Sequence, residues 1–188
     1  MDAFDALNAR DPSGKELPYA RRMTHWLDRL APDASEPLRL AARSHHLMRW
    51  HIPRSDFPMD RIGYLKWRTT LYDFHADKAA EVLREVGYKD DLIARVRSLI
   101  RKEKIKADPE TQLLEDVICL VFLESYFADF SRDHDEEKLV SILRKTWGKM
   151  SPRGHDAAMG LQLGEREKAL IARALAPRSG PSTGDAAT

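Results

Sequence analysis

The chain has 188 residues, of which 43% are hydrophobic and 32% charged, and its formal net charge is +1. This mixture is typical of a globular domain with a real core, and the small net charge gives no global electrostatic argument for nucleic acid or a membrane surface as a partner. A single cysteine, Cys119, excludes an intramolecular disulfide and a zinc site built from cysteines. Because no stretch forms a signal core or approaches a membrane span, we expect a cytoplasmic protein without a membrane partner.

Hydrophobic residues recur with a helical period and do not alternate as in strands, so the pattern predicts an all-α fold. We expect a single compact domain of about seven to eight helices over residues 15–176, with an HD-domain-like arrangement implied by a resemblance given below. A short helix and turn over residues 1–14 would precede the domain, and a disordered tail over residues 177–188 would follow it. The expected helices cover residues 3–9, 18–31, 37–50, 60–86, 90–101, 110–130, 135–147 and 165–175.

Cap residues and prolines set these boundaries. Ser35 is an expected N-cap, because its hydroxyl can accept a hydrogen bond from a backbone N–H of the first turn. Asp108 followed by Pro109 combines such a cap with a proline at the first helical position. Pro53 should end the helix over residues 37–50, since a proline pushes the preceding residue out of the α region.

Several ionisable residues fall where a core residue is expected. On a helical wheel, Asp116 lies in the middle of an apolar stripe, and His75 lies on the apolar face of its own helix. A carboxylate in such a place is costly unless it is paired, protonated or bound to metal. His45 shares the apolar face of its helix and His46 lies at its margin, whereas His25 lies opposite the apolar face and should be exposed.

Two interpretations account for these residues. In the first, Asp116 pairs with an arginine such as Arg49 in a structural network, because buried polar groups usually have partners. In the second, a divalent metal is held by imidazoles and one carboxylate, a ligand set that suits zinc, iron, manganese or nickel without choosing among them. Both lead us to expect that His46 or His45 lies close to His75 and Asp116.

Short motifs distributed in order over residues 17–175 carry a resemblance to a known family. They are YARRMT (19–24), AARSHHLMRW (41–50), IPR (52–54), YLKWR (64–68), HADKA (75–79), LEDV (114–117), FADF (127–130) and KMSPRG (149–154). They resemble domain-of-unknown-function family 4202, which implies a compact helical protein without a settled activity. In this family's pattern the second histidine is the motif residue, so the resemblance favours His46 over His45.

Some members of that family carry the label glutamyl-tRNA synthetase, which this sequence does not support. A synthetase of that class needs a nucleotide-binding α/β core and a HIGH-like motif, and the sequence has neither. Lys149, Met150 and Ser151 match the start of a KMSKS loop, but here they are expected to form a helix end followed by an N-cap.

A more distant similarity is to the HD-domain phosphohydrolases, which are also all-helical. Their metal site takes histidines from early helices, a His-Asp pair from a helix end and an aspartate from a later helix. By this resemblance His46 stands for the histidine of the pair, Asp116 for the late aspartate and His75 for an extra histidine of some members. The chain departs from the pattern in two places, because Leu47 replaces the paired aspartate and only His25 could supply the first-helix histidine.

We therefore expect a metal-binding, HD-like phosphohydrolase, or a degenerate relative, that acts on a phosphorylated small molecule or nucleotide. The metal would lower the pKa of a bound water and so generate a nucleophile. Cationic side chains would neutralise the phosphate. The expected metal ligands are His46, His75 and Asp116, and the expected catalytic cations are Arg49, Arg68 and Lys102.

The alternative is a non-catalytic helical module that binds a protein, nucleotide or RNA through residues 49–54 and the basic run over residues 101–106. Aromatic residues that follow the histidines, such as Tyr64 and Trp67, indicate core packing first and a lid over a pocket second. Bound metal would favour the hydrolase, whereas an ion pair between Arg49 and Asp116 in the same space would favour the module.

Overall fold

The computed structural model describes residues 1–105 and 107–177, and over those residues it confirms the all-α prediction for a single domain. This part of the chain contains ten α-helices and two short 3₁₀ helices. The tail expected over residues 177–188 lies, apart from Pro177, outside the described residues. The elements are α1 (Asp2–Asn8), α2 (Glu16–Leu30), α3 (Glu36–Ser44), η1 (Arg49–His51), η2 (Arg54–Asp56), α4 (Arg61–Glu85), α5 (Asp90–Ile100), α6 (Pro109–Ser125), α7 (Phe127–Arg132), α8 (Glu136–Trp147), α9 (Pro152–Met159) and α10 (Glu165–Leu175).

The expected number of helices, about seven to eight, is too low because two boundaries were not predicted. The helix expected over residues 110–130 is interrupted at Tyr126, whose φ of −128° and ψ of −22° separate α6 from α7. The cap and proline at Ser151 and Pro152 open a further short helix, α9. Side-chain N-caps on Ser35, Asp60, Asp108, Asp135 and Ser151 each accept a hydrogen bond from a first-turn N–H.

The helix predicted over residues 37–50 is wrong beyond Ser44, where α3 ends. Met48 adopts φ +55° and ψ +33°, a left-handed conformation that residues other than glycine rarely adopt, and the chain then enters η1. His45 and His46 therefore lie in a turn, and their positions on a helical wheel do not describe where their side chains point. This turn brings both histidines to one side of α4.

The core lies where α2 packs against α3 and α6, and where α5 packs against α3 and α4. Met23, Trp26 and Leu27 of α2 are buried at its centre. The N-terminal segment joins the same core, because Phe4 is buried and Asp5 pairs with Arg43 at 2.6 Å.

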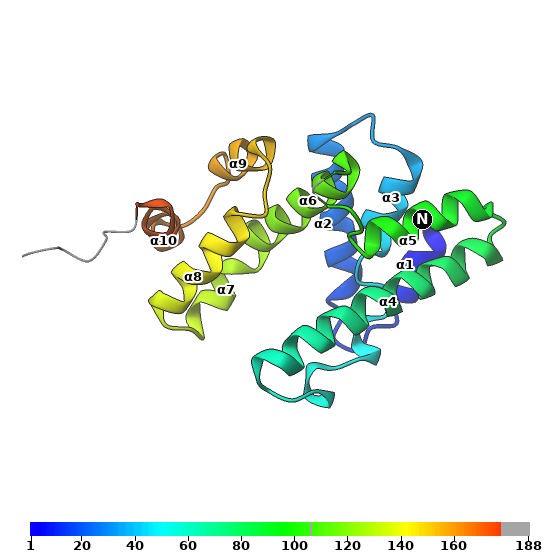
Figure 1. Cartoon of the computed structure of the whole chain (residues 1–188), viewed down its shortest axis with the longest axis horizontal. Coiled ribbons are helices and arrows are strands. Elements are labelled where there is room, and N and C mark those ends of the chain that lie inside the picture. The colour runs from blue at the N-terminus through cyan, green and yellow to red at the C-terminus, as the bar shows by residue number, and fades with distance from the viewer. Residues whose placement is uncertain (106, 178–188) are drawn as a thin grey trace, which may run out of the picture.

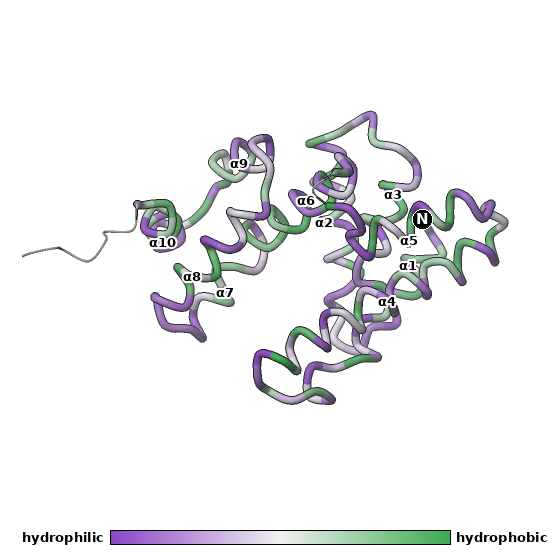
Figure 2. The backbone as a smooth tube through the Cα atoms, viewed as in Figure 1, coloured by the Kyte–Doolittle hydropathy of each residue, from purple (hydrophilic) through white to green (hydrophobic). Residues whose placement is uncertain are grey.

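Two arms project from this core, as Figure 1 shows. One is the N-terminal half of α4 with the loop before it, and the other contains α7 and α8. Figure 2 shows hydrophobic residues on the first arm, where Met59, Ile62 and Leu65 are 80%, 77% and 52% exposed. Among residues 1–105 and 107–177, no helix combines the length and the apolar character needed to cross a membrane.

Asp116 is buried, as predicted, and it attaches α9 to α6. Its Oδ1 accepts a hydrogen bond from the backbone N–H of Ser151 at 2.7 Å, and its Oδ2 accepts one from the Ser151 hydroxyl at 2.5 Å. The Gln112 amide also donates to Oδ1, at 3.2 Å. A Cβ on Gly154 would lie 2.7 Å from the same oxygen, so the carboxylate fits closely against the start of α9.

We predict that Asp116→Ala lowers the free energy of unfolding by about 2–4 kcal/mol, because it leaves two donors of Ser151 without their acceptor. His25→Ala is the control, since His25 is exposed and such changes usually stay within about 0.5 kcal/mol. Denaturant unfolding of both variants measures the difference, and equal stabilities would contradict this role of Asp116.

Candidate functional site

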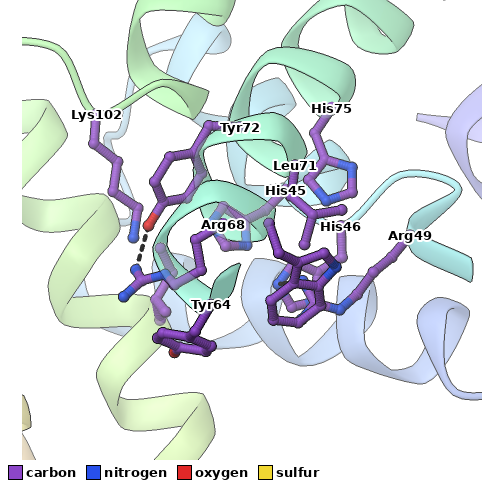
Figure 3. A pocket seen from close by; sticks show the side chains of 11 residues that line it. His45, His46, Arg49, Tyr64, Arg68, Leu71, Tyr72, His75 and Lys102 are labelled. Carbon is purple, nitrogen blue, oxygen red and sulfur yellow. Dashed lines mark hydrogen bonds between the residues drawn. The ribbon is translucent and has the colours of Figure 1, made fainter. Parts of the chain in front are cut away.

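Side chains from the turn after α3, from η1, from α4 and from two later segments line a cavity of about 130 Å³. Figure 3 shows them directed into a common space. Three kinds of predicted side-chain group line the cavity: imidazoles, guanidiniums and an ammonium. Tyrosine side chains line it as well. Its polar lining consists of His45, His46, His75, Arg49, Arg68, Lys102, Tyr64 and Tyr72.

Helix α4 supplies much of this lining because its residues recur at helical spacing. Tyr64, Arg68, Tyr72 and His75 follow one another at intervals of three or four, which places them on one face. Arg68 and His75 were expected at the site from the sequence, whereas Tyr72 was not. The spacing itself is the signal that could have found it.

The structure brings His46 and His75 together, with ring centroids 5.8 Å apart. His45 joins them, since its ring stacks on that of His46 at 4.7 Å. Tyr19, which was not selected from the sequence, also stacks on His46, with ring centroids 4.0 Å apart, and has its hydroxyl 3.0 Å from Nδ1 of His45. Both adjacent histidines, and not one of them, therefore belong to the site.

Burial keeps all three imidazoles neutral. Desolvation lowers the pKa of His75 to about 4, against an ordinary value of 6.5. It also holds the pKa values of His45 and His46 well below their usual range, and the neighbouring cations Lys102 and Arg49 lower them further. At neutral pH each ring consequently offers one N–H donor and one lone pair.

The two arginines of the cavity are partly buried without a carboxylate partner. The guanidinium of Arg49 lies 4.7 Å from the ring centre of Trp67, and that of Arg68 donates to the Tyr72 hydroxyl. Among the ion pairs of the described residues, none includes Arg49 or Arg68. Burial also lowers the pKa of Arg49, which expresses the cost of holding this charge away from water.

The basic run over residues 101–106 has mixed roles. Arg101 pairs with Asp73 at 2.8 Å on the surface, whereas Lys102 lines the cavity and pairs with Glu115. Lys149 also forms an ion pair with Glu115, at 3.7 Å. Lys106 lies outside the described residues. Only one residue of this run that the structure describes thus reaches the site.

The cavity opens into a cleft of about 1420 Å³ between the two arms. Nine lysines and arginines line the cleft against three carboxylates, although the whole chain has a net charge of only +1. Sequence reasoning missed the contribution of α8, where Lys138 and Lys145 are seven residues apart and so share a face. The nine cations are Lys15, Arg49, Arg54, Arg61, Arg68, Lys102, Lys138, Lys145 and Lys149.

Asp116 does not line either the cavity or the cleft, because its oxygens are bound to Ser151 and Gln112. The described residues contain no ion pair between Arg49 and Asp116 and no group of three or more His, Cys, Asp or Glu side chains that could hold a metal. The three residues expected to share a metal are therefore not assembled in this part of the chain.

The donor set of the cavity also does not fit a divalent metal. Two of its imidazole nitrogens have free lone pairs or N–H groups, but no carboxylate lines the cavity in the described chain, and three cations do. A divalent cation would be repelled by these charges, whereas an anion would be attracted. The cavity thus combines three cations with neutral hydrogen-bonding groups, a lining that suits an anion better than a metal ion.

Comparison with known proteins gives one match. The model of the family described as Domain of unknown function (DUF4202) matches residues 1–171, which confirms the resemblance seen in the motifs. Neither the curated proteins nor the solved structures contain a match to this chain. The similarity to HD-domain phosphohydrolases stays a prediction.

Glu16 lies at the edge of the site, with one carboxylate oxygen 3.5 Å from Nδ1 of His46. Desolvation raises its pKa from 4.5 to about 7, although Arg49 opposes the shift. Between these two values the folded protein keeps a proton that the unfolded chain has lost, so stability falls as the pH rises through this range.

We predict that Glu16→Gln removes this loss, because the amide stays neutral at every pH. The stability of the variant relative to the natural protein should increase by about 2 kcal/mol between pH 4.5 and pH 8. Thermal unfolding at both pH values measures the change, and the exposed Glu85→Gln variant provides a reference for the loss of a surface carboxylate. A difference that is the same at both pH values would contradict the raised pKa of Glu16.

Proposed function

We propose that this chain, which belongs to the family described as Domain of unknown function (DUF4202), binds a phosphate-bearing small molecule in the cleft. The phosphate would lie in the cavity between Arg49, Arg68 and Lys102. The family description assigns no activity, so support for the proposal comes from the site. The observation that carries it is the convergence of two partly buried guanidiniums that have no carboxylate partner among the described residues.

A buried cation without a counter-ion is costly, and a phosphate would supply the missing charge. Guanidinium groups also match phosphate geometry, because each can donate two parallel hydrogen bonds. Lys102 differs from the arginines, since Glu115 already balances its charge. The ammonium group of Lys102 would donate a hydrogen bond to the ligand while it stays paired with Glu115.

The rest of the ligand would lie in the wider cleft, whose walls provide aromatic faces. Tyr64 borders both the cavity and the cleft, and Phe122 and Tyr126 line the opposite wall. The cleft is larger than the roughly 300–1,000 Å³ of typical small-molecule pockets, so it has room for a ligand of nucleotide size. Additional cations on α8, such as Lys145, could neutralise further negative groups of the ligand.

The HD-like arrangement and metal-dependent hydrolysis form a second and separate part of this proposal. The cationic lining supports phosphate binding directly, whereas it gives no support to a metal at the same place. A non-catalytic binding module, which was the alternative from the sequence, accounts for the same features. Turnover is therefore tested separately from binding.

We predict that nucleotides and other phosphate monoesters stabilise the protein against heat and that Arg49→Gln weakens their binding by about 10–100-fold, because it removes charged hydrogen bonds. Arg29→Gln is the matched control, since Arg29 lies over Trp26 at 4.2 Å much as Arg49 lies over Trp67, but it is exposed and does not line the cleft. Thermal shifts and titration calorimetry measure the effect. The proposal fails if no phosphate compound binds, or if both variants lose affinity equally.

The second part of the proposal, metal-dependent hydrolysis, is tested by phosphate release. Release is measured from the compounds that bind, with and without added manganese, cobalt or zinc. Release that depends on metal would support a hydrolase of the HD-like type. Binding without release would support a protein that senses or carries a phosphorylated ligand, and would remove hydrolysis from the proposal.

A further inference from the structure

Two buried nitrogen atoms in the cavity have no partner within the described protein. They are Nε2 of His45 and Nε2 of His75, and their side chains are only 4% and 2% exposed. Both residues line the cavity together with Arg68 and Lys102. Figure 3 labels both among the side chains that line the cavity, with His75 on α4 and His45 in the turn after α3. Buried polar atoms nearly always have a hydrogen-bond partner, so an unpartnered pair in one cavity indicates a ligand.

The hydrogen bonds on the far side of the rings determine what each Nε2 can do. Nδ1 of His75 lies 2.8 Å from the carbonyl oxygen of Leu47, and a carbonyl can only accept. Nδ1 therefore carries the proton, and Nε2 of His75 is an acceptor. Nδ1 of His45 faces the hydroxyl of Tyr19, which can donate or accept, so Nε2 of His45 can adapt to either role.

A phosphate cannot satisfy these nitrogens alone. Its second pKa is about 6, so above that pH its oxygens carry no proton to donate to His75. A hydroxyl group both donates and accepts, so the hydroxyl groups of one ligand could satisfy an acceptor such as Nε2 of His75 and an adaptable group such as Nε2 of His45. The cavity volume of about 130 Å³ greatly exceeds the roughly 10–15 Å³ that a single water requires, so it can contain a phosphate and the adjoining carbon atoms.

We infer that the ligand of this cavity is a phosphorylated polyhydroxy compound of the sugar phosphate class, whose hydroxyl groups donate to Nε2 of His75 and contact Nε2 of His45. The phosphate lies between Arg49, Arg68 and Lys102. This inference rests on the proposed function and adds the chemical class of the ligand. The histidines act as binding residues that select the hydroxyl group, and no step of bond making or breaking is assigned to them.

The test compares matched ligands by titration calorimetry at pH 8. Triose, pentose and hexose phosphates carry both groups, and propyl, pentyl and hexyl phosphates carry the phosphate without hydroxyl groups. At least one sugar phosphate should bind about ten-fold or more tightly than its alkyl counterpart, because the alkyl chain leaves buried polar atoms unpaired. Equal affinities throughout would overturn the inference and leave the proposed function intact, whereas a failure of every phosphate to bind would overturn both.

The variant His75→Asn isolates the acceptor. The asparagine amide can still donate to the Leu47 carbonyl, as Nδ1 does, but it has no group at the position of Nε2. We expect its preference for the sugar phosphate to fall to about two-fold or less while its affinity for the alkyl phosphate stays within about two-fold. A preference that persists in folded His75→Asn would overturn the role of His75. If this variant does not fold, the comparison of ligands on the natural protein decides the inference by itself.

Discussion

The hydrogen bond from His75 to the carbonyl of Leu47 is the interaction on which the site depends. It joins α4 to the turn after α3 across 28 positions of sequence, and it does so beside the left-handed residue Met48. Together with the hydrogen bond from Nε1 of Trp67 to the carbonyl of Ile52, it holds the segment after α3 against α4, and the cavity lies between them. One hydrogen bond therefore orients a ring, assigns its tautomer and closes one end of the site.

Charge is distributed unevenly over a molecule that is nearly neutral as a whole. Some surface cations are paired, as Arg101 is with Asp73, whereas Arg49 and Arg68 keep their charge beside aromatic rings. The cleft has a positive potential because nine cations line it against three carboxylates. Net charge computed from the sequence conceals this arrangement, because it averages over pairs that only the fold defines.

Local features were predictable from the sequence, and features set by distant contacts were not. The caps on Asp60 and Asp108 follow from residues within one turn, and the burial of His75 and Asp116 follows from helical periodicity. The partner of Asp116 lies 35 positions away at Ser151, and periodicity contains no information about that pair. The turn at Met48 was missed because good helix formers surround it and no glycine marks the left-handed residue. We predicted a metal site because burial suggested that His46, His75 and Asp116 lie close together. A buried polar group can instead bond to a partner on another side, as Asp116 does with Ser151.

The position of Cys119 has a consequence for redox chemistry. This residue, the single cysteine of the chain, lies in the wall of the cleft, where burial raises the pKa of its thiol to about 12. The reactive form of cysteine is the thiolate, and at neutral pH almost none is present here. We therefore expect oxidants and alkylating reagents to react slowly with this buried, protonated sulfur, unlike with a reactive thiol in the same place.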